Sequence, residues 1–562
     1  MAHTTADEQG VEQATETAPG TGREETERGE TGRREMAASG RAPAARVIAR
    51  LRRVRRVVWL SLLVAAASVV AQWILMPPPL YFDPYYVWSA AASWPDIPLT
   101  RWPFTEVPHQ VTRIGLVLPA RLAQEIFGPG QAAYVVVTAL GGCAFFTGTY
   151  LVVRSLFGDA AGLASAAILL VHPFFTMTNP FGHEITWSTG VMLPDMPGAG
   201  LFAIGMTCLV AASRRTGRAQ TRMLLVAGAF LGTSFLIREF LAFLFLAIPV
   251  YLALLRIPWR RNVTVGAPML AILAFNLVHN QVIWGTPLAG LVSAATHGGQ
   301  SRDYVTRELA LRSFPRAMHD WNALGVVFTV ALVLTIIGWA VTRDRRLALV
   351  LVWFLALAVP LTLFSGVLDP NDIKLRGWLP RYWFSVLPAL LAGGFGSLVL
   401  MARKLPSGLA ARLRARPRAV RAAAASLAVV ALGGAYVVTA VRAVPDLPRD
   451  KAWSELRGYL AGHPDLTLIC ADRRLAQTLT FYTRDVWGEP VWRGRIRDFP
   501  HYLPKVPTNA KEGPMLYTRW RGMESQIGSG WRPPDHGWTL RWRSSDGVLE
   551  IWDPPPASTD RP

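Results

Sequence analysis

Long apolar runs recur along this 562-residue chain and constrain its fold more than any other feature. A helix needs about 20 mainly apolar residues to cross the roughly 30 Å hydrocarbon core of a bilayer. The runs predict a polytopic, all-α membrane domain with about eleven transmembrane helices. The candidate spans are residues 57–76, 131–153, 160–178, 195–212, 223–237, 240–255, 263–283, 321–342, 347–364, 383–401 and 422–441.

The charges between the runs predict the orientation of the chain. Lys and Arg gather on the cytoplasmic side of membrane proteins. If the N-terminus is inside, the inside segments hold 25 Lys and Arg residues and two acidic residues, whereas the outside loops hold 11 and 12. The bias favours a cytoplasmic N-terminus and an extracytoplasmic C-terminus. Residues 223–255 are the least regular part, because only Arg238 and Glu239 separate two apolar runs there.

The composition agrees with a membrane protein and argues against two other classes. The chain is 51% hydrophobic and only 17% charged. Its net charge of +20 comes from short basic clusters between apolar runs, so no nucleic-acid partner is expected. The three cysteines form no disulfide framework and no Cys-x-x-Cys metal motif.

The two ends of the chain differ from its apolar middle. Residues 1–45 begin with a segment rich in Thr, Glu and Gly and should be a disordered cytoplasmic tail, followed by the polytopic domain over 46–442. Residues 443–562 read as a small extracytoplasmic α/β domain. Helix-like "KAWSELRGYLAGH" leads there into the strand-like runs "LTLIC", "GPMLYT" and "TLRWRSSDGVLEIW".

The first outside loop, residues 77–130, contains the clearest candidate for chemistry. In "PPPLYFDPYYVW" a lone acid, Asp83, stands in an aromatic collar just beyond the first apolar run. Further along, "RIGLVLPARLAQEIFG" is too short and too charged to span, and it suits an amphipathic helix in the membrane interface. The loop would then hold Asp83 at the membrane surface.

Four stretches in this order resemble one group of membrane enzymes. They are "YFDPYYVWSAAASW", "LPDMPGAGLF", "NQVIWGTPLAG" and "LPRYWFSVLPALL". They resemble the GT-C membrane glycosyltransferases, especially the protein O-mannosyltransferase and aminoarabinose-transferase branch, over roughly residues 57–400. Asp83 occupies the first acidic place of the branch, but Pro84 replaces the usual second acid, so any role of that acid is absent here.

The resemblance implies a hexosyl or pentosyl transferase of the cell envelope. The donor would be a polyprenyl-phosphate sugar in the bilayer, and the acceptor an extracytoplasmic hydroxyl on a polysaccharide, a protein or a lipid. Asp83 would be the general base, because a hydroxyl becomes a good nucleophile only when a base takes its proton. With one base and no second acid, an inverting displacement is expected.

The leaving lipid phosphate needs cations, since negative charge develops on it. The outer-face segments offer four, and these are the predicted donor-phosphate ligands: Arg238, Lys374, Arg376 and Arg381. Candidate substrate-binding residues are Tyr85, Tyr86, His109, His183, Glu184, Asp195, Glu239 and Tyr382. No cofactor is predicted, and a divalent ion shared by Asp83 and another acid remains an open alternative.

Each assignment has a structural alternative. Asp83 and Asp195 could cap helices, because Asp is common at helix starts and proline in the first turn. Arg238 and Glu239 could pair with each other across a tight turn. Arg381 could anchor its span at the headgroups. The His183-Glu184 pair could be a solvated loop.

Two other functions fit a polytopic chain. A transporter would usually show internal repeats and polar groups at mid-membrane, and here the polar residues cluster at the outer ends of the spans. A cell-envelope scaffold that binds a partner through its C-terminal domain would not need a lone acid in the first loop. Sugar transfer from a radiolabelled donor would separate these functions.

Overall fold

A computed structural model of the protein describes residues 54–73, 79, 83–97, 109–172, 174, 192–298, 305–320, 323–404, 430, 431, 433–439, 450–499, 512–519, 533 and 537–556. The chain divides into two compact units, Met1–Leu62 and Leu63–Pro562. In the first unit the described residues, 54–62, are helical. The predicted disordered tail, residues 1–45, lies outside the described residues. The loops, the long helices and the C-terminal domain discussed below all lie in the second unit.

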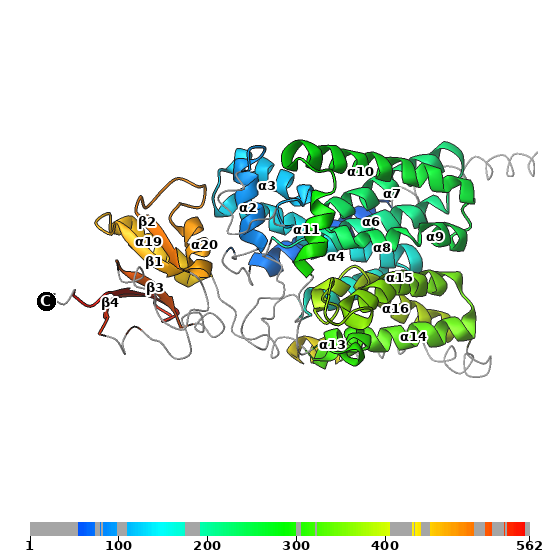
Figure 1. Ribbon diagram of the computed structural model, residues 1–562. Helices are drawn as coiled ribbons and strands as arrows, with labels where there is room; N and C mark the ends of the chain where they lie inside the picture. The colour runs from blue at the N-terminus through cyan, green and yellow to red at the C-terminus, as the bar shows by residue number, and fades with distance from the viewer. Residues whose placement is uncertain are drawn as a thin grey trace, which may run out of the picture. The chain divides into compact units, whose positions relative to one another are not determined.

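Long apolar helices form most of the second unit (Figure 1). Six helices in the described ranges are long and apolar enough to cross a membrane: Val54–Trp73, α4 (Gln131–Phe157), α6 (Asp195–Ala212), α7 (Gly217–Ile237), Trp259–Trp284 with α10 (Asn262–Trp284), and Arg345–Val367 with α15 (Arg345–Thr362). Three apolar helices are shorter: α5 (Asp159–Leu170), α14 (Val326–Thr342) and α16 (Leu387–Arg403). The prediction of a multi-pass, mainly helical membrane domain is confirmed.

The helical bundle differs from the predicted spans in detail. The segment predicted as a span over 240–255 is broken into η3 (Glu239–Leu241), α8 (Ala242–Phe245) and α9 (Ile248–Leu254), with Pro249 opening the last piece. The predicted span 160–178 is helical only to Leu170 in its described part. Most of 422–441 lies outside the described residues. The predicted count of eleven spans is therefore not confirmed.

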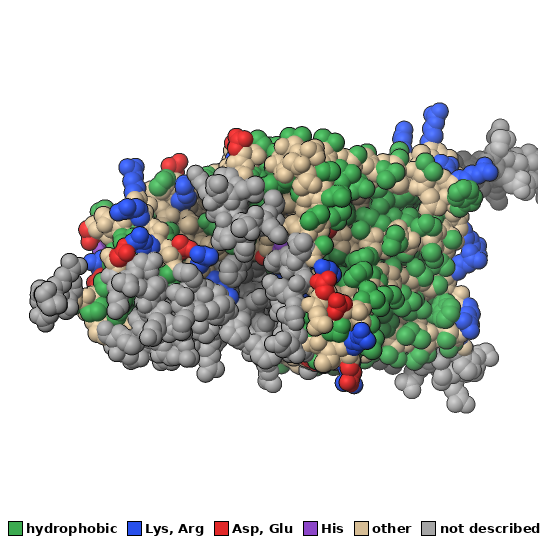
Figure 2. Space-filling model, in the orientation of Figure 1, with side chains coloured by type: hydrophobic (Ala, Val, Ile, Leu, Met, Phe, Trp, Pro, Cys, Tyr) green, Lys and Arg blue, Asp and Glu red, His purple; other side chains and the backbone are tan. Residues whose placement is uncertain are grey.

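Packing and exposure along the helices are typical of a bundle surrounded by lipid. Helix α4 packs against α6, α6 against α7, α7 against α10, and α14 against α16. Figure 2 shows hydrophobic side chains spread over the outer surface of this bundle. They include Leu270 and Val278 on α10, and Val330 and Ile337 on α14. A surface this apolar would be costly in water and is expected against hydrocarbon.

The first outside loop folds into two helices that pack together, α2 (Asp83–Ser93) and α3 (Ile114–Phe127). Helix α3 is the predicted amphipathic helix. It buries one side against α4 and α7 and leaves Leu122 and Ile126 exposed on the other. Gly115 lets α3 approach α7, because a Cβ at this position would meet the backbone of Leu236. The loop is thus a packed layer that positions Asp83 at the start of α2.

The C-terminal region is an α/β domain, as predicted. Its five-stranded sheet has the order β2-β1-β3-β5-β4, formed by β1 (Leu468–Asp472), β2 (Arg495–Phe499), β3 (Met515–Thr518), β4 (Thr539–Arg543) and β5 (Leu549–Asp553). Strand β1 runs parallel to β2 and β3, whereas β5 runs antiparallel to β3 and β4. Helices α19 (Asp450–Gly462) and α20 (Arg473–Tyr482) flank β1 in sequence. Strand β2 was not predicted, because "RIRDF" carries no apolar alternation.

This domain is packed against the first outside loop. The ring of Phe481 on α20 lies 5.6 Å from Trp88 on α2 and 5.4 Å from Tyr134 on α4. Gln131, the first residue of α4, donates to Asp450 at 2.7 Å and accepts from Arg457 at 2.7 Å. These apolar and polar contacts join α20 to the helix that begins with Asp83.

Candidate active site

Asp83 is the first residue of α2 and its side chain is partly exposed. Its carboxylate accepts a hydrogen bond of 2.6 Å from the side-chain amide of Gln110, in the segment that precedes α3. The capping alternative would have the carboxylate accept from the first backbone N–H groups of its own helix. The hydrogen bond that the described residues show comes instead from another segment, so Asp83 is held by tertiary structure.

Three cationic side chains act on the Asp83 carboxylate. Burial by itself would raise the pKa of Asp83, because it disfavours the charged form. The charges of His109, Arg381 and Arg113 and the hydrogen bond from Gln110 outweigh burial, and they hold the pKa of Asp83 well below its ordinary value. Asp83 is therefore ionised at neutral pH inside a cationic surround.

Arg113 links this surround to a second acid. Its Nε atom lies 3.4 Å from both carboxylate oxygens of Glu239, and the Arg113 side chain is only 2% exposed. Arg113 immediately precedes α3, and Glu239 opens η3 just after α7. The ion pair thus joins the first outside loop to the outer end of α7.

Arg238 forms a separate, buried ion pair. Its Nε atom lies 3.0 Å from Oδ1 of Asp195, the first residue of α6, and both side chains are nearly inaccessible to solvent. The guanidinium carbon also lies 4.7 Å from the ring centroid of Phe240 and 4.8 Å from that of Tyr382. Ring faces attract cations, so the two aromatic contacts add to the ion pair.

The predicted alternative that Arg238 pairs with its neighbour Glu239 is wrong. Arg238 has an extended backbone, with φ −144° and ψ 102°. Consecutive side chains of an extended segment point to opposite sides. Arg238 therefore turns toward Asp195 on α6, and Glu239 turns toward Arg113 at the start of α3.

The structure brings most of the residues predicted from sequence into one cluster. Arg381 acts on both Asp83 and Arg238, and it thereby connects the two ion pairs to the lone acid. We call this group the outer cluster; its members are Asp83, His109, Gln110, Arg113, Asp195, Arg238, Glu239, Arg381 and Tyr382. Three residues come from the first loop and the others from the starts or ends of four distant segments.

Four predicted residues are not placed in the outer cluster. Lys374 pairs with Asp372 at 2.8 Å, and both side chains are more than one-third exposed. Arg376 is half-buried, and no contact with the outer cluster is shown for it among the described residues. His183 and Glu184 lie outside the described residues. The predictions for these four residues therefore remain predictions.

Two members of the outer cluster were not singled out as site residues from the sequence. Gln110 and Arg113 stand three residues apart in "HQVTR", beside the predicted His109. A polar cluster immediately before an amphipathic helix was the available signal. The sequence does not show that this segment folds back to Asp83, because the two are separated by 27 positions.

Tyr85 and Tyr86 take a different place from the rest. They follow Asp83 on α2 and line a cavity between α2 and helix α20 of the C-terminal domain. The side chain of Gln477 on α20 hydrogen-bonds Tyr86. Burial raises the pKa of the Tyr86 phenol, so this side chain stays neutral at physiological pH.

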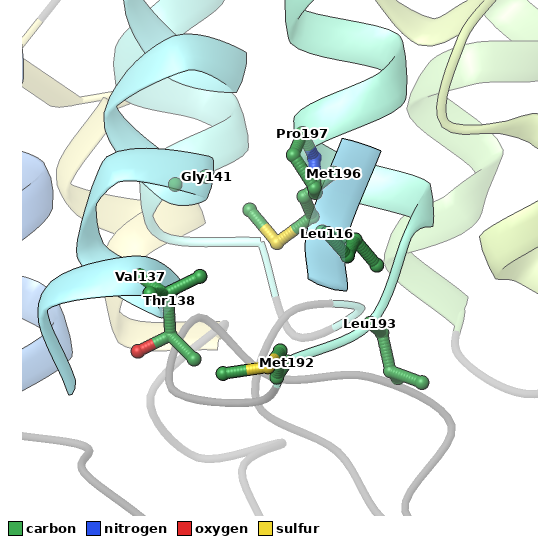
Figure 3. Close-up of a pocket in the computed structure, with 9 residues that line it drawn as sticks. Leu116, Val137, Thr138, Gly141, Met192, Leu193, Met196 and Pro197 are labelled. Atoms are coloured by element: carbon green, nitrogen blue, oxygen red, sulfur yellow. The ribbon is translucent and has the colours of Figure 1, made fainter. Parts of the chain in front are cut away.

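A small apolar pocket lies beside the start of α6. Figure 3 shows it lined by residues of α3, α4 and α6, among them Leu116, Val137 and Met196. Its volume of about 10 Å³ is room for about one water molecule. The pocket is too small for a sugar or a lipid chain, so it contributes packing rather than a substrate site.

Metal ligands were also sought in the described ranges. Within them, no group of three or more His, Cys, Asp and Glu side chains is placed to hold a metal ion. The cations of the outer cluster are therefore arginine and histidine side chains of the chain itself.

Comparisons with known proteins agree with the motifs. Residues 117–284 match the family dolichyl-phosphate-mannose-protein mannosyltransferase. The solved structure of ArnT from Cupriavidus metallidurans bound to undecaprenyl phosphate is similar, with 16% sequence identity and a TM-score of 0.52 over 89% of this chain and 97% of that chain. Apo ArnT from the same organism matches with the same identity and coverage and a TM-score of 0.50. No curated protein matches the sequence.

At this identity the structural similarity concerns the fold, and the family match covers the central part of the chain. Both point to the same group of membrane enzymes as the four sequence motifs. The chain therefore has the fold of the GT-C membrane glycosyltransferases, and its residues 117–284 match their mannosyltransferase family.

Proposed function

We propose that this protein transfers a sugar, hexosyl or pentosyl, from a polyprenyl-phosphate donor to an extracytoplasmic hydroxyl, with inversion at the anomeric carbon. The observation that carries the proposal is the ionised Asp83 surrounded by Arg113, Arg381 and His109. One carboxylate and several cations are what a proton-abstracting, phosphate-releasing reaction requires. The similarity to ArnT bound to undecaprenyl phosphate supports this class of donor.

The roles of the three acids follow from their partners. Asp195 and Glu239 are each paired with an arginine, Arg238 and Arg113. Asp83 accepts its hydrogen bond from the neutral amide of Gln110. A carboxylate that is not locked in a close ion pair is the one best able to accept a proton, so Asp83 is the base.

The proposed step is a single displacement. The acceptor oxygen attacks the anomeric carbon from the face opposite the phosphate, and the new carbon–oxygen bond forms as the bond from that carbon to the phosphate oxygen breaks. The acceptor proton passes to Asp83. The electron pair of the broken bond leaves with the polyprenyl phosphate, whose negative charge Arg381 and its neighbours stabilise.

Donor binding would also adjust the strength of the base. The cations that lower the pKa of Asp83 are those that a phosphate would attract. When the donor phosphate shares these charges, the pKa of Asp83 should rise toward its ordinary value. The carboxylate would then become a stronger base only when the donor is in place.

The deciding experiment measures sugar transfer directly. Purified protein in lipid nanodiscs would receive radiolabelled polyprenyl-phosphate sugars, both hexosyl and pentosyl, together with cell-envelope material as acceptor. Transfer of label to the acceptor with release of polyprenyl phosphate is the expected result. A chain that binds these donors and transfers none of their sugars to any acceptor fraction would contradict the proposed function.

We expect kcat/KM for transfer to stay nearly constant as the pH falls from 8 to about 5, because the free-enzyme pKa of Asp83 lies below its ordinary value of about 3.9. A depressed pKa keeps the carboxylate charged, and its stabilising contacts are lost only as the pH falls through the folded-state value. The measurement is the rate at limiting substrate across this range. His109 also titrates, so an acid limb above pH 5 that persists in His109→Gln would contradict the prediction.

We expect a reporter that is active only in the cytoplasm to be silent when it is fused after Pro562. The charge bias between the spans puts the C-terminus outside, and Figure 2 shows Lys and Arg side chains gathered at one end of the helical bundle. The same reporter fused after Arg56 is the matched control and should be active. An active C-terminal fusion would put the outer cluster's C-terminal neighbour on the wrong side for this reaction.

A further inference from the structure

A cavity of about 820 Å³ lies between α2 and the C-terminal domain. Tyr85, Ser89 and Ser93 line it from α2, and Arg473, Gln477 and Asp498 from α20 and β2. Pockets of about 300–1,000 Å³ hold small molecules or segments of larger ones. This volume therefore suits a ligand of several sugar or amino-acid units.

The cavity begins within one helical turn of Asp83. Its first wall residues, Tyr85 and Tyr86, are two and three positions beyond Asp83 on the same helix. The Asp83 charge acts on Tyr86, which places both side chains in one electrostatic environment. A ligand in the cavity can thus extend to the proposed base.

The walls of the cavity combine aromatic faces with polar groups. Tyr85, Tyr86, Trp88 and Phe481 supply aromatic surface, and Trp88 and Phe481 are fixed by their contact at 5.6 Å. Hydroxyl, amide, carboxylate and guanidinium groups come from the other wall residues. A sugar ring presents C–H groups on its faces and hydroxyls around its rim. The C–H groups pack on the electron-rich faces of aromatic rings, and the hydroxyls use the polar groups.

The other two acceptor classes fit these walls less well. A lipid chain would leave the charged and polar side chains of Arg473, Asp498 and Gln477 without water, which is costly. A peptide could pair with the backbone of a strand. Strand β2, however, meets the cavity through the side chains of Ile496 and Asp498, which lie two residues apart on one face of the sheet.

We infer that the cavity between α2 and α20 binds the acceptor, and that the acceptor is a saccharide chain whose terminal hydroxyl reaches Asp83. This inference rests on the proposed function and narrows its acceptor from three classes to one. It also assigns a role to the C-terminal domain, which would form one wall of the acceptor site and hold the chain against α2.

The test uses two variants of the full-length protein, each with a matched control. Ala92→Trp places a bulky ring at the cavity from an exposed position of α2, and Ala461→Trp does the same at an exposed position of α19 that does not line the cavity. Arg473→Ala removes one arginine of an exposed Arg–Asp pair in the cavity wall. Arg541→Ala removes its counterpart from the similarly exposed pair with Asp553.

The readouts are the half-saturating amount of cell-envelope polysaccharide in the transfer assay and the thermal shift caused by undecaprenyl phosphate. Ala92→Trp should raise the half-saturating amount at least about tenfold and Arg473→Ala about five- to tenfold, the scale of a lost charged hydrogen bond. Neither should change the thermal shift, because the donor phosphate binds elsewhere. Both controls should behave as the unsubstituted protein.

Two results would overturn the inference. If Ala92→Trp and Arg473→Ala keep the half-saturating amount of their controls, the acceptor does not bind in this cavity. If the transferred label is released by protease or extracted by organic solvent instead of remaining in polysaccharide, the acceptor is not a saccharide. Failure of the proposed function looks different, since the unsubstituted protein would then transfer no sugar to any fraction.

Discussion

Asp83→Asn is expected to lower the rate of sugar transfer at least about a hundredfold, the usual scale for loss of a general base. The amide keeps the size of the carboxylate, and its oxygen can still accept the hydrogen bond from Gln110. It cannot take the acceptor proton. The rate at saturating donor and acceptor is the measurement, with thermal unfolding as the check on folding.

Donor binding should respond in the opposite direction. Asp83→Asn removes a negative charge from among Arg113, Arg381 and His109, so these cations become more available to a phosphate. Undecaprenyl phosphate should bind the variant at least as tightly as it binds the unsubstituted protein. A variant that loses both transfer and phosphate binding would show a damaged site rather than a missing base.

The matched control for this substitution is Asp96→Asn. Asp96 is an exposed acid in the same loop, beyond the end of α2. It should transfer sugar at the normal rate. If Asp83→Asn also folds and works normally, Asp83 is only a favourable charge at the start of its helix, and the base must be sought elsewhere.

Arg381→Ala is expected to lower transfer about ten- to a hundredfold, because a charged hydrogen bond is worth about 1.5–3 kcal/mol. Arg381 acts on both Asp83 and Arg238, so it stands where the leaving phosphate must be stabilised beside the base. Arg381→Lys should restore activity only in part, since an ammonium group lacks the planar fork that binds two phosphate oxygens. Transfer rate and undecaprenyl phosphate affinity should fall together.

Arg376→Ala is the comparison for Arg381→Ala. Arg376 lies five positions earlier in the same outer segment and is half-buried, without a described contact to the outer cluster. Its substitution should reduce transfer less. Equal losses in both variants would mean that the phosphate is held by the whole segment and not chiefly by Arg381.

Arg238 is a poor choice for this test, although the sequence suggests it as a phosphate ligand. Its charge is already paired with Asp195 in the interior and covered by Phe240 and Tyr382. Removing Arg238 would leave a buried carboxylate unpaired, which is strongly destabilising. A loss of activity would then report misfolding and not a lost contact with the donor.

Local patterns in the sequence were enough to predict the membrane class of the chain, the positions of most long helices and the α/β character of the C-terminal domain. Hydrophobicity over about 20 residues decides whether a helix can span a bilayer, and it is a property of each segment by itself. Where the local signal was weak, the prediction was less good. The segment 240–255 is apolar but breaks at short helices, and β2 lacks apolar alternation.

The candidate site divides in the same way. The sequence by itself determined that a lone acid, Asp83, follows the first apolar run, and that basic residues gather at the outer ends of distant spans. Only the tertiary structure decided the partners: Gln110 with Asp83, Arg113 with Glu239, and Arg238 with Asp195. An ion pair depends on the distance between side chains from different segments, and no local pattern encodes how the helices that carry them pack against each other.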